Sequence, residues 1–166
     1  MLRKQILPAE PGAHRGAPGK TRDPDAKDIP ALATVLVTSE SPEHPVDNLF
    51  DGRDGPGGTR WIASADGEQT LILSFDTPQL IREVSLETEE LETSRTQSLT
   101  LSLSRDGGRT YRELLRQEFT FSPPGTTFER ESWRVPGEGV THLRVMVLPD
   151  KGHAPVRATL TSLTVR

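Results

Sequence analysis

Alternation of apolar and polar residues constrains the fold of this chain more than any other feature of its sequence. Residues 99–104 alternate leucine with threonine or serine, and residues 71–75 and 143–147 carry apolar residues at every second position. This period of two places successive side chains on opposite faces of a β-strand. No segment carries a long apolar stripe at helical spacing, and residues 111–119 are the only candidate for a helix. The pattern therefore predicts half-buried strands.

Turn-forming residues divide the chain into eight or so short strands. The strongest turn is Asp106-Gly107-Gly108, because Asp and Gly tolerate the positive φ of tight hairpins. Pro123-Pro124-Gly125 and the run 136–139 also break the chain. The expected strands span residues 33–38, 71–75, 81–86, 99–104, 111–121, 126–135, 143–147 and 156–165, with a bulge near residues 81–84 to correct the phase. Strands at this spacing predict an all-β, antiparallel sandwich.

The first thirty residues differ in composition from the rest. They contain five prolines and three glycines but almost no apolar residues, and they hold six Lys/Arg against four Asp/Glu. We expect a disordered N-terminal arm over residues 1–30 and one folded domain over residues 31–166. The arm is interpreted as a solubilising leader, with contact to nucleic acid or to an acidic partner as the alternative.

The net charge and the lack of long apolar runs argue against several classes of function. A net charge of −4 argues against a general polyanion binder, so nucleic acid is not the expected partner. No run of 18 apolar residues exists, and the acidic first loop argues against an anionic bilayer, so we expect no membrane partner. No apolar segment of the signal-peptide type follows Arg3 and Lys4, which favours the cytoplasm. We expect a monomer.

A loop rich in glycine runs from His44 to Trp61. Leu49 and Phe50 are its apolar anchors, and the run Gly55-Pro56-Gly57-Gly58 must be irregular. Trp61 closes the loop with about 150–250 Å² of aromatic surface. We expect Trp61 to be a core residue that holds the loop against a sheet, and Trp133 to be buried or partly buried.

Four motifs in this order resemble the discoidin, or coagulation factor 5/8 type C, family, which is similar to family 32 carbohydrate-binding modules. The resemblance covers about residues 33–166. It rests on the loop Asn48–Gly52 closed by Thr59-Arg60-Trp61, the strand pair 71–76 and 81–86, the hairpin Ser104–Tyr111, and the strand 143–147. The resemblance implies a jelly-roll β-sandwich of the galactose-binding type, whose ligands meet the loops at one end.

The resemblance also implies site residues. A structural Ca²⁺ is expected near the Asp-Gly loop, with Asp51, Asp54 and Thr59 as ligands, because oxygen ligands suit this hard cation. This chain has Ser162 where the family often supplies a Glu, and its spacer before Thr59 is about three residues longer. Sugar hydroxyls are expected to meet His44, Arg60, Asp66 and His153.

No catalytic constellation is present in the sequence. The chain has no cysteine, no Gly-x-Ser-x-Gly, no histidine pair at metal spacing and no phosphate-binding loop. Glu87, Glu89, Glu90 and Glu92 are interpreted as a solvated connection between strands, with paired catalytic carboxylates as the alternative. We therefore expect no enzyme and no catalytic residues.

Two functions remain open for a binding module of this kind. The first is recognition of a carbohydrate through the loops at one end of the sandwich. The second is an intracellular protein–protein interaction or scaffold role, which relatives of the same fold perform. The expected partner is accordingly a glycan or a protein, and no certain cofactor is implied beyond the structural Ca²⁺.

Overall fold

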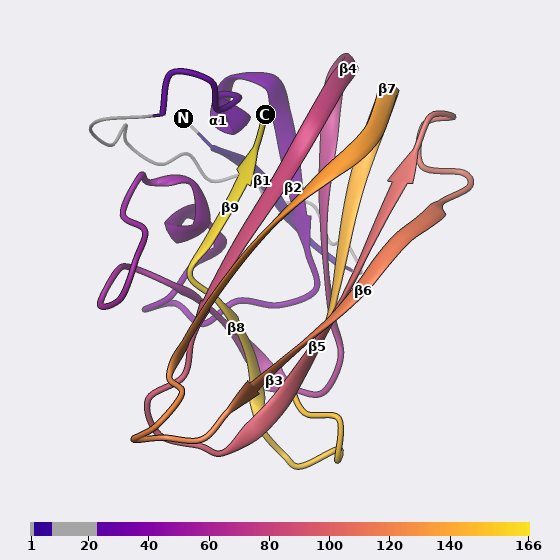
Figure 1. The fold of residues 1–166 in the computed structure, drawn as a ribbon. Coiled ribbons are helices and arrows are strands. Elements are labelled where there is room, and N and C mark those ends of the chain that lie inside the picture. Colours follow the sequence, from indigo (N-terminus) through magenta and orange to yellow (C-terminus); the bar gives the residue numbers. More distant parts are fainter. Residues whose placement is uncertain (1, 8–22) are drawn as a thin grey trace.

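The computed structural model describes residues 2–7 and 23–166, which form a β-sandwich of two packed layers (Figure 1). The elements, in chain order, are β1 (Arg3–Ile6), α1 (Ile29–Leu32), β2 (Ala33–Val37), the 3-10 helix η1 (Val46–Phe50), β3 (Trp61–Asp66), β4 (Gln69–Glu89), β5 (Arg95–Ser104), β6 (Arg112–Phe121), β7 (Phe128–Leu148), β8 (Arg157–Leu160) and β9 (Ser162–Val165). The prediction of an all-β sandwich is confirmed, and residues 111–119 contribute to a strand and not to a helix.

Two long strands, β4 and β7, belong to both layers of the sandwich. The first part of β4 pairs with β2 and with the end of β7, and the second part pairs with β9 and with the start of β7. The register shifts between Ser74 and Glu83, where the strands cross from one layer to the other. This confirms the irregularity expected before Val84. The first layer continues through β5 to the edge strand β6, and β3 pairs with β8 in a separate two-stranded sheet.

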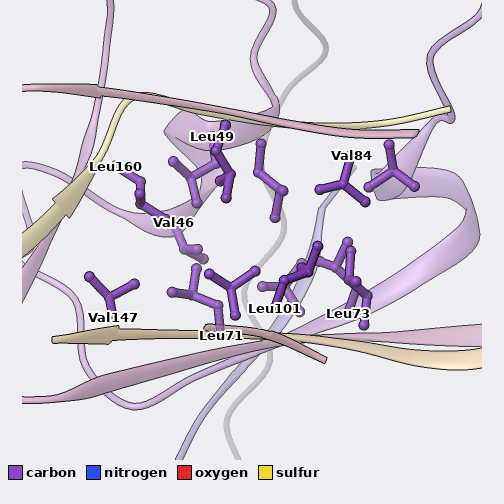
Figure 2. Packing of buried hydrophobic residues seen from close by; sticks show 14 of the residues in the cluster. Val46, Leu49, Leu71, Leu73, Val84, Leu101, Val147 and Leu160 are labelled. Atoms are coloured by element: carbon purple, nitrogen blue, oxygen red, sulfur yellow. The ribbon is translucent and has the colours of Figure 1, made fainter. Parts of the chain in front are cut away.

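The core lies between the two layers and is built from the alternating residues. Figure 2 shows Leu71, Leu73 and Leu101 pointing from one layer toward Val84 and Leu160 of the other. The leucines of β5 are at most 2 % exposed, and Leu143, Val145 and Val147 of β7 are equally buried. The inward positions predicted from the period of two are therefore confirmed.

Several predicted strand limits were wrong. The segments 71–75 and 81–86 belong to one continuous strand, β4, and β3 was not among the expected strands. Residues 136–139 do not end a strand, because β7 continues through them beside β4. A Cβ at Gly137 would lie 2.3 Å from the carbonyl oxygen of Ile81, so this glycine permits close approach of two strands and not a turn. The closing segment 156–165 is two strands, since Thr161 leaves the sheet of β8 and donates its N–H to the Glu87 carbonyl at 2.8 Å.

The predicted disordered arm over residues 1–30 is corrected at both of its ends. Strand β1 pairs in parallel with β2, and Leu2 beside it is only 4 % exposed. Further along, the N–H of Lys27 donates to the Val165 carbonyl at 2.7 Å, and Ile29 enters the core. Low apolar content concealed these segments, because one or two buried residues and a free sheet edge suffice to bind them. Residues 8–22 lie outside the described residues.

No helix in the described part of the chain has the length and apolar character needed to cross a bilayer.

Candidate functional site

A surface cavity of about 540 Å³ lies at the end of the sandwich where β3 and β8 are found, at the bottom of Figure 1. Its volume is within the range of small-molecule sites. Four segments far apart in the sequence meet there: the loop after β2, the start of β3, the turn between β4 and β5, and the start of β8. The lining residues are His44, Arg60, Ile62, Glu90, Leu91, Glu92, Thr93, Arg95, Val156, Arg157 and Thr159.

Arg60 is fixed in the cavity wall by a buried carboxylate. Its Nη2 lies 2.7 Å from Oε1 of Glu89, whose side chain is only 4 % exposed, and its Nη1 donates to the Glu89 carbonyl at 3.4 Å. The backbone carbonyl of Arg60 accepts from the side-chain amide of Asn48 at 2.8 Å. A guanidinium held by two acceptors, on a backbone that is itself fixed, presents its remaining donors in a fixed direction.

The turn between β4 and β5 is also held by charge. Arg95 is 8 % exposed, and its Nη2 lies 2.6 Å from Oε2 of Glu90. The Glu90 carboxylate further accepts the N–H groups of Glu92 and Thr93 at 2.9 and 3.0 Å. Partial burial by itself raises the pKa of Glu90, but these N–H groups and Arg95 together hold the pKa below its usual value. Glu90 is therefore ionised at neutral pH.

Arg95 also joins this turn to the opposite wall of the cavity. Its Nη1 donates to the carbonyl of Arg157 at 2.6 Å and to that of Pro149 at 3.3 Å. Among the described residues its buried Nε–H finds no acceptor. A buried donor without a partner costs about 1–3 kcal/mol.

The loop that carries His44 is tied to the N-terminal strand. Lys4 of β1 is paired with Asp47, and its Nζ lies 2.9 Å from Oε1 of Glu40. Burial lowers the pKa of Lys4, but the two carboxylates outweigh this effect and raise it. The His44 carbonyl accepts the N–H of Ile62 at 3.1 Å. The predicted arm thus contributes to the position of a cavity residue.

The structure brings together two of the four predicted ligand residues. His44 and Arg60 line the cavity, whereas Asp66 and His153 are exposed and are not among its lining residues. Asp66 lies across from Arg157 in the β3–β8 pair, and His153 lies on the loop after β7 with a φ of 58°. A role for Asp66 and His153 in binding stays a prediction.

Sequence reasoning missed the residues of the β4–β5 turn. The acidic run was interpreted as a solvated connection, but Glu87 and Glu89 are 5 % and 3 % exposed and belong to β4. Their alternation with Leu86 and Thr88 did not reveal that the glutamates are buried, because the end of β4 is buried on both faces and not on one. The arginines that neutralise them, Arg60 and Arg130, are distant in sequence.

These two buried carboxylates also hold the glycine-rich loop. Glu87 accepts the N–H of Gly55 at 2.7 Å, and Glu89 accepts the N–H of Gly57 at 3.0 and 3.2 Å. Gly55 and Gly57 have φ values of 82° and 77°, which turn their N–H groups toward the acids without strain. The loop is therefore anchored by polar bonds as well as by Leu49 and Trp61.

The residues expected to bind Ca²⁺ do not fit a common cation. Both carboxylate oxygens of Asp51 accept hydrogen bonds, from the N–H of Arg53 at 2.8 Å and from the hydroxyl of Thr59 at 2.5 Å. Asp54 lines a different cleft, beside Lys27 and Arg166. Within residues 2–7 and 23–166 no three acidic or histidine side chains are close enough to share a metal. Ca²⁺ binding by Asp51, Asp54 and Thr59 stays a prediction that this geometry does not support.

Because hydrogen bonds already satisfy Asp51, we expect Ca²⁺ to add no stability. Thermal unfolding of the full chain in CaCl₂ and in EDTA should give the same Tm, since a ligand stabilises only by binding the folded state. Mg²⁺ at equal ionic strength is the control for a general salt effect. A Tm that rises with Ca²⁺ concentration alone would restore the metal site.

The two tryptophans lie as expected. Trp61 is fully buried at the start of β3, and its indole N–H donates to the Ser39 carbonyl at 3.0 Å. Trp133 of β7 is partly buried against the core. Neither lines the cavity.

Comparison with known proteins gives likeness in structure only. No family model and no curated protein matches the sequence. The family 32 carbohydrate-binding module of NanJ from C. perfringens, solved with galactose, is 14 % identical with a TM-score of 0.58, over 84 % of this chain and 96 % of that one. The chitosan-binding module 1 of a chitosanase/glucanase from Paenibacillus sp. IK-5 is 19 % identical with a TM-score of 0.58, over 84 % and 98 %.

A larger protein contains the same fold. A GH29 fucosidase from Ruminococcus gnavus, solved with fucose, is 14 % identical with a TM-score of 0.64, over 84 % of this chain but only 26 % of that one. At these identities the likeness shows the fold alone. It confirms the galactose-binding-like β-sandwich that the sequence motifs predicted.

Proposed function

We propose that this protein is a non-catalytic carbohydrate-binding module whose sugar site is the cavity at the β3–β8 end. The observation that carries the proposal is the fixed set of hydrogen-bonding groups there. Arg60 and Arg95 are held by buried or half-buried acids, and His44 stands on the facing loop. Planar groups held in place suit the hydroxyls of a sugar, because little side-chain entropy is lost on binding.

The solved structures of the same fold support this choice of ligand. They include modules in complex with galactose, with an unsaturated mannuronic acid and with a GalNAc-galactose disaccharide. The ligand differs between these proteins, so they support a carbohydrate class and leave the particular sugar open. They favour a glycan over a protein partner for this chain.

The charges in the cavity argue for binding without catalysis. A glycosidase needs one carboxylic acid that is protonated near neutral pH and a second that is ionised. Here Glu89 and Glu90 are each paired with an arginine, and the pKa of Glu90 is lowered. Neither acid is suited to donate a proton to a glycosidic oxygen.

NMR titration of the full chain with a panel of sugars tests the proposal. Galactose, N-acetylgalactosamine, glucosamine oligomers and galacturonate should be compared at the same pH and salt. We expect at least one sugar to shift amide resonances of the β4–β5 turn and the His44 loop, with a Kd between about 1 μM and 1 mM. A panel that shifts no resonance of these segments would overturn the proposal.

A variant with two substitutions links that binding to the cavity. His44→Ala with Arg157→Ala removes two lining side chains for which the described residues show no hydrogen-bond partner, so the fold should persist. We expect at least tenfold weaker binding, about 1.4 kcal/mol. Arg116→Ala on β6, outside the cavity, is the matched control and should bind as the wild type does. Equal binding by all three proteins would place the sugar elsewhere.

A further inference from the structure

Two arginines of the cavity are neutralised before any ligand arrives. Arg60 lies 2.7 Å from Glu89, and Arg95 lies 2.6 Å from Glu90. The third arginine, Arg157, forms no ion pair among the described residues, but the lining also contains the carboxylate of Glu92. Three arginines and three glutamates therefore give the site no formal excess of charge.

This balance disfavours an anionic sugar. To bind Arg60 or Arg95, a carboxylate or sulfate would have to replace Glu89 or Glu90, and each of these acids also accepts backbone N–H hydrogen bonds. Displacing either one would leave a charge with little access to water, which is costly. Hydroxyl groups, in contrast, add to the free donors and acceptors of paired residues without displacing either partner.

One apolar side chain stands out in the same wall. Leu91 is 55 % exposed, more than any other large hydrophobic residue that the structure describes, and it lies in the β4–β5 turn. The Glu90 carboxylate holds the backbone of this turn through the N–H groups of Glu92 and Thr93. The described lining residues include no Phe, Tyr or Trp. Ile62 and Val156 also line the cavity but are less exposed, so Leu91 offers the most accessible apolar surface to a sugar ring.

We propose that the cavity binds an uncharged hexopyranose whose apolar face packs on Leu91. This rests on the proposed function and adds two determinants of specificity to it. Paired arginines give the site its preference for uncharged rings, and Leu91 takes the part that an aromatic ring plays in other sugar sites. The C–H groups of one pyranose face bury apolar area against the leucine, which supplies affinity without direction.

Calorimetric titration of methyl galactoside and methyl glucoside, with their uronate counterparts, into Leu91 variants tests both determinants. We expect Leu91→Ala to weaken binding of the neutral sugar about five- to tenfold. Leu91→Trp should strengthen it several-fold, because the larger face buries more area. Leu80→Ala is the matched control, since Leu80 is 45 % exposed on β4 outside the cavity. The neutral sugar should bind equally in low and high salt.

The outcomes separate this inference from the proposed function. If a neutral sugar binds but Leu91→Ala binds it as the wild type does, the role of Leu91 is overturned and the sugar site stands. If a uronate binds more tightly than its neutral counterpart, with affinity that falls as salt rises, the preference for uncharged rings is overturned. If no sugar binds the wild type, the proposed function fails as well.

Discussion

Replacing Trp61 by alanine is expected to lower the free energy of unfolding by about 3–5 kcal/mol. The side chain is fully buried, so its loss leaves a cavity between β3 and the loop after β2. Its indole N–H also donates to the Ser39 carbonyl, which would lose that donor. In a chain of this size the loss corresponds to a fall in Tm of about 6–20 °C. Chemical denaturation followed by circular dichroism measures the change directly.

Trp133→Ala is the matched control for that substitution. Trp133 is only partly buried against the core, so the same chemical change should cost less than half as much. Trp61→Phe keeps an aromatic ring and gives a folded variant if Trp61→Ala does not fold. Equal losses at Trp61 and Trp133 would contradict the role of Trp61 as the anchor of the glycine-rich loop.

Replacing Glu89 by alanine is expected to lower the free energy of unfolding by about 2–4 kcal/mol. The substitution leaves the Gly57 N–H without its acceptor and Arg60 without its counter-charge. Arg60 is 21 % exposed and would regain some hydration, which keeps the cost below that of a fully buried pair. Urea denaturation measures the loss, and proteolysis between Gly52 and Gly58 reports whether the loop has been released.

An exposed ion pair supplies the control for Glu89. Glu113 and Arg116 form a pair on β6 with side chains 46 % and 71 % exposed, so Glu113→Ala should cost at most about 1 kcal/mol. Glu89→Gln keeps an oxygen for the Gly57 N–H but loses the charge, and it should fall between the two. If Glu89→Ala unfolds in urea at the wild-type midpoint, the buried carboxylate does not hold the loop.

The sequence predicted the parts of the fold that depend on local period. Leu99, Leu101 and Leu103 alternate with hydroxyl residues, and that alternation alone placed them in the core. Trp61 was predictable for a different reason, because the glycine-rich loop needs a large apolar anchor and the corresponding tryptophan of the resembled family is a packing residue. His44 and Arg60 were found because they lie on loops that the family resemblance places at the ligand-binding end.

Other features were not encoded in any single segment. The β4–β5 turn looked like a solvated acidic run, yet Glu87 and Glu89 are buried because Arg130, Arg60 and two glycine N–H groups meet them. Their partners lie about thirty to forty residues away in sequence. The same distance concealed the cavity, which needs the turn, the His44 loop and β8 together.

The sequence by itself determined which faces of the strands are apolar, and hence that two β layers enclose one core. Only the tertiary structure decided that residues 2–7 add an edge strand, that β4 and β7 cross between layers, and which charges are paired in the cavity. The physical reason is the distance along the sequence over which each property is set. Period is a property of neighbouring residues, whereas burial of a charge depends on partners that only the folded chain brings within bonding distance.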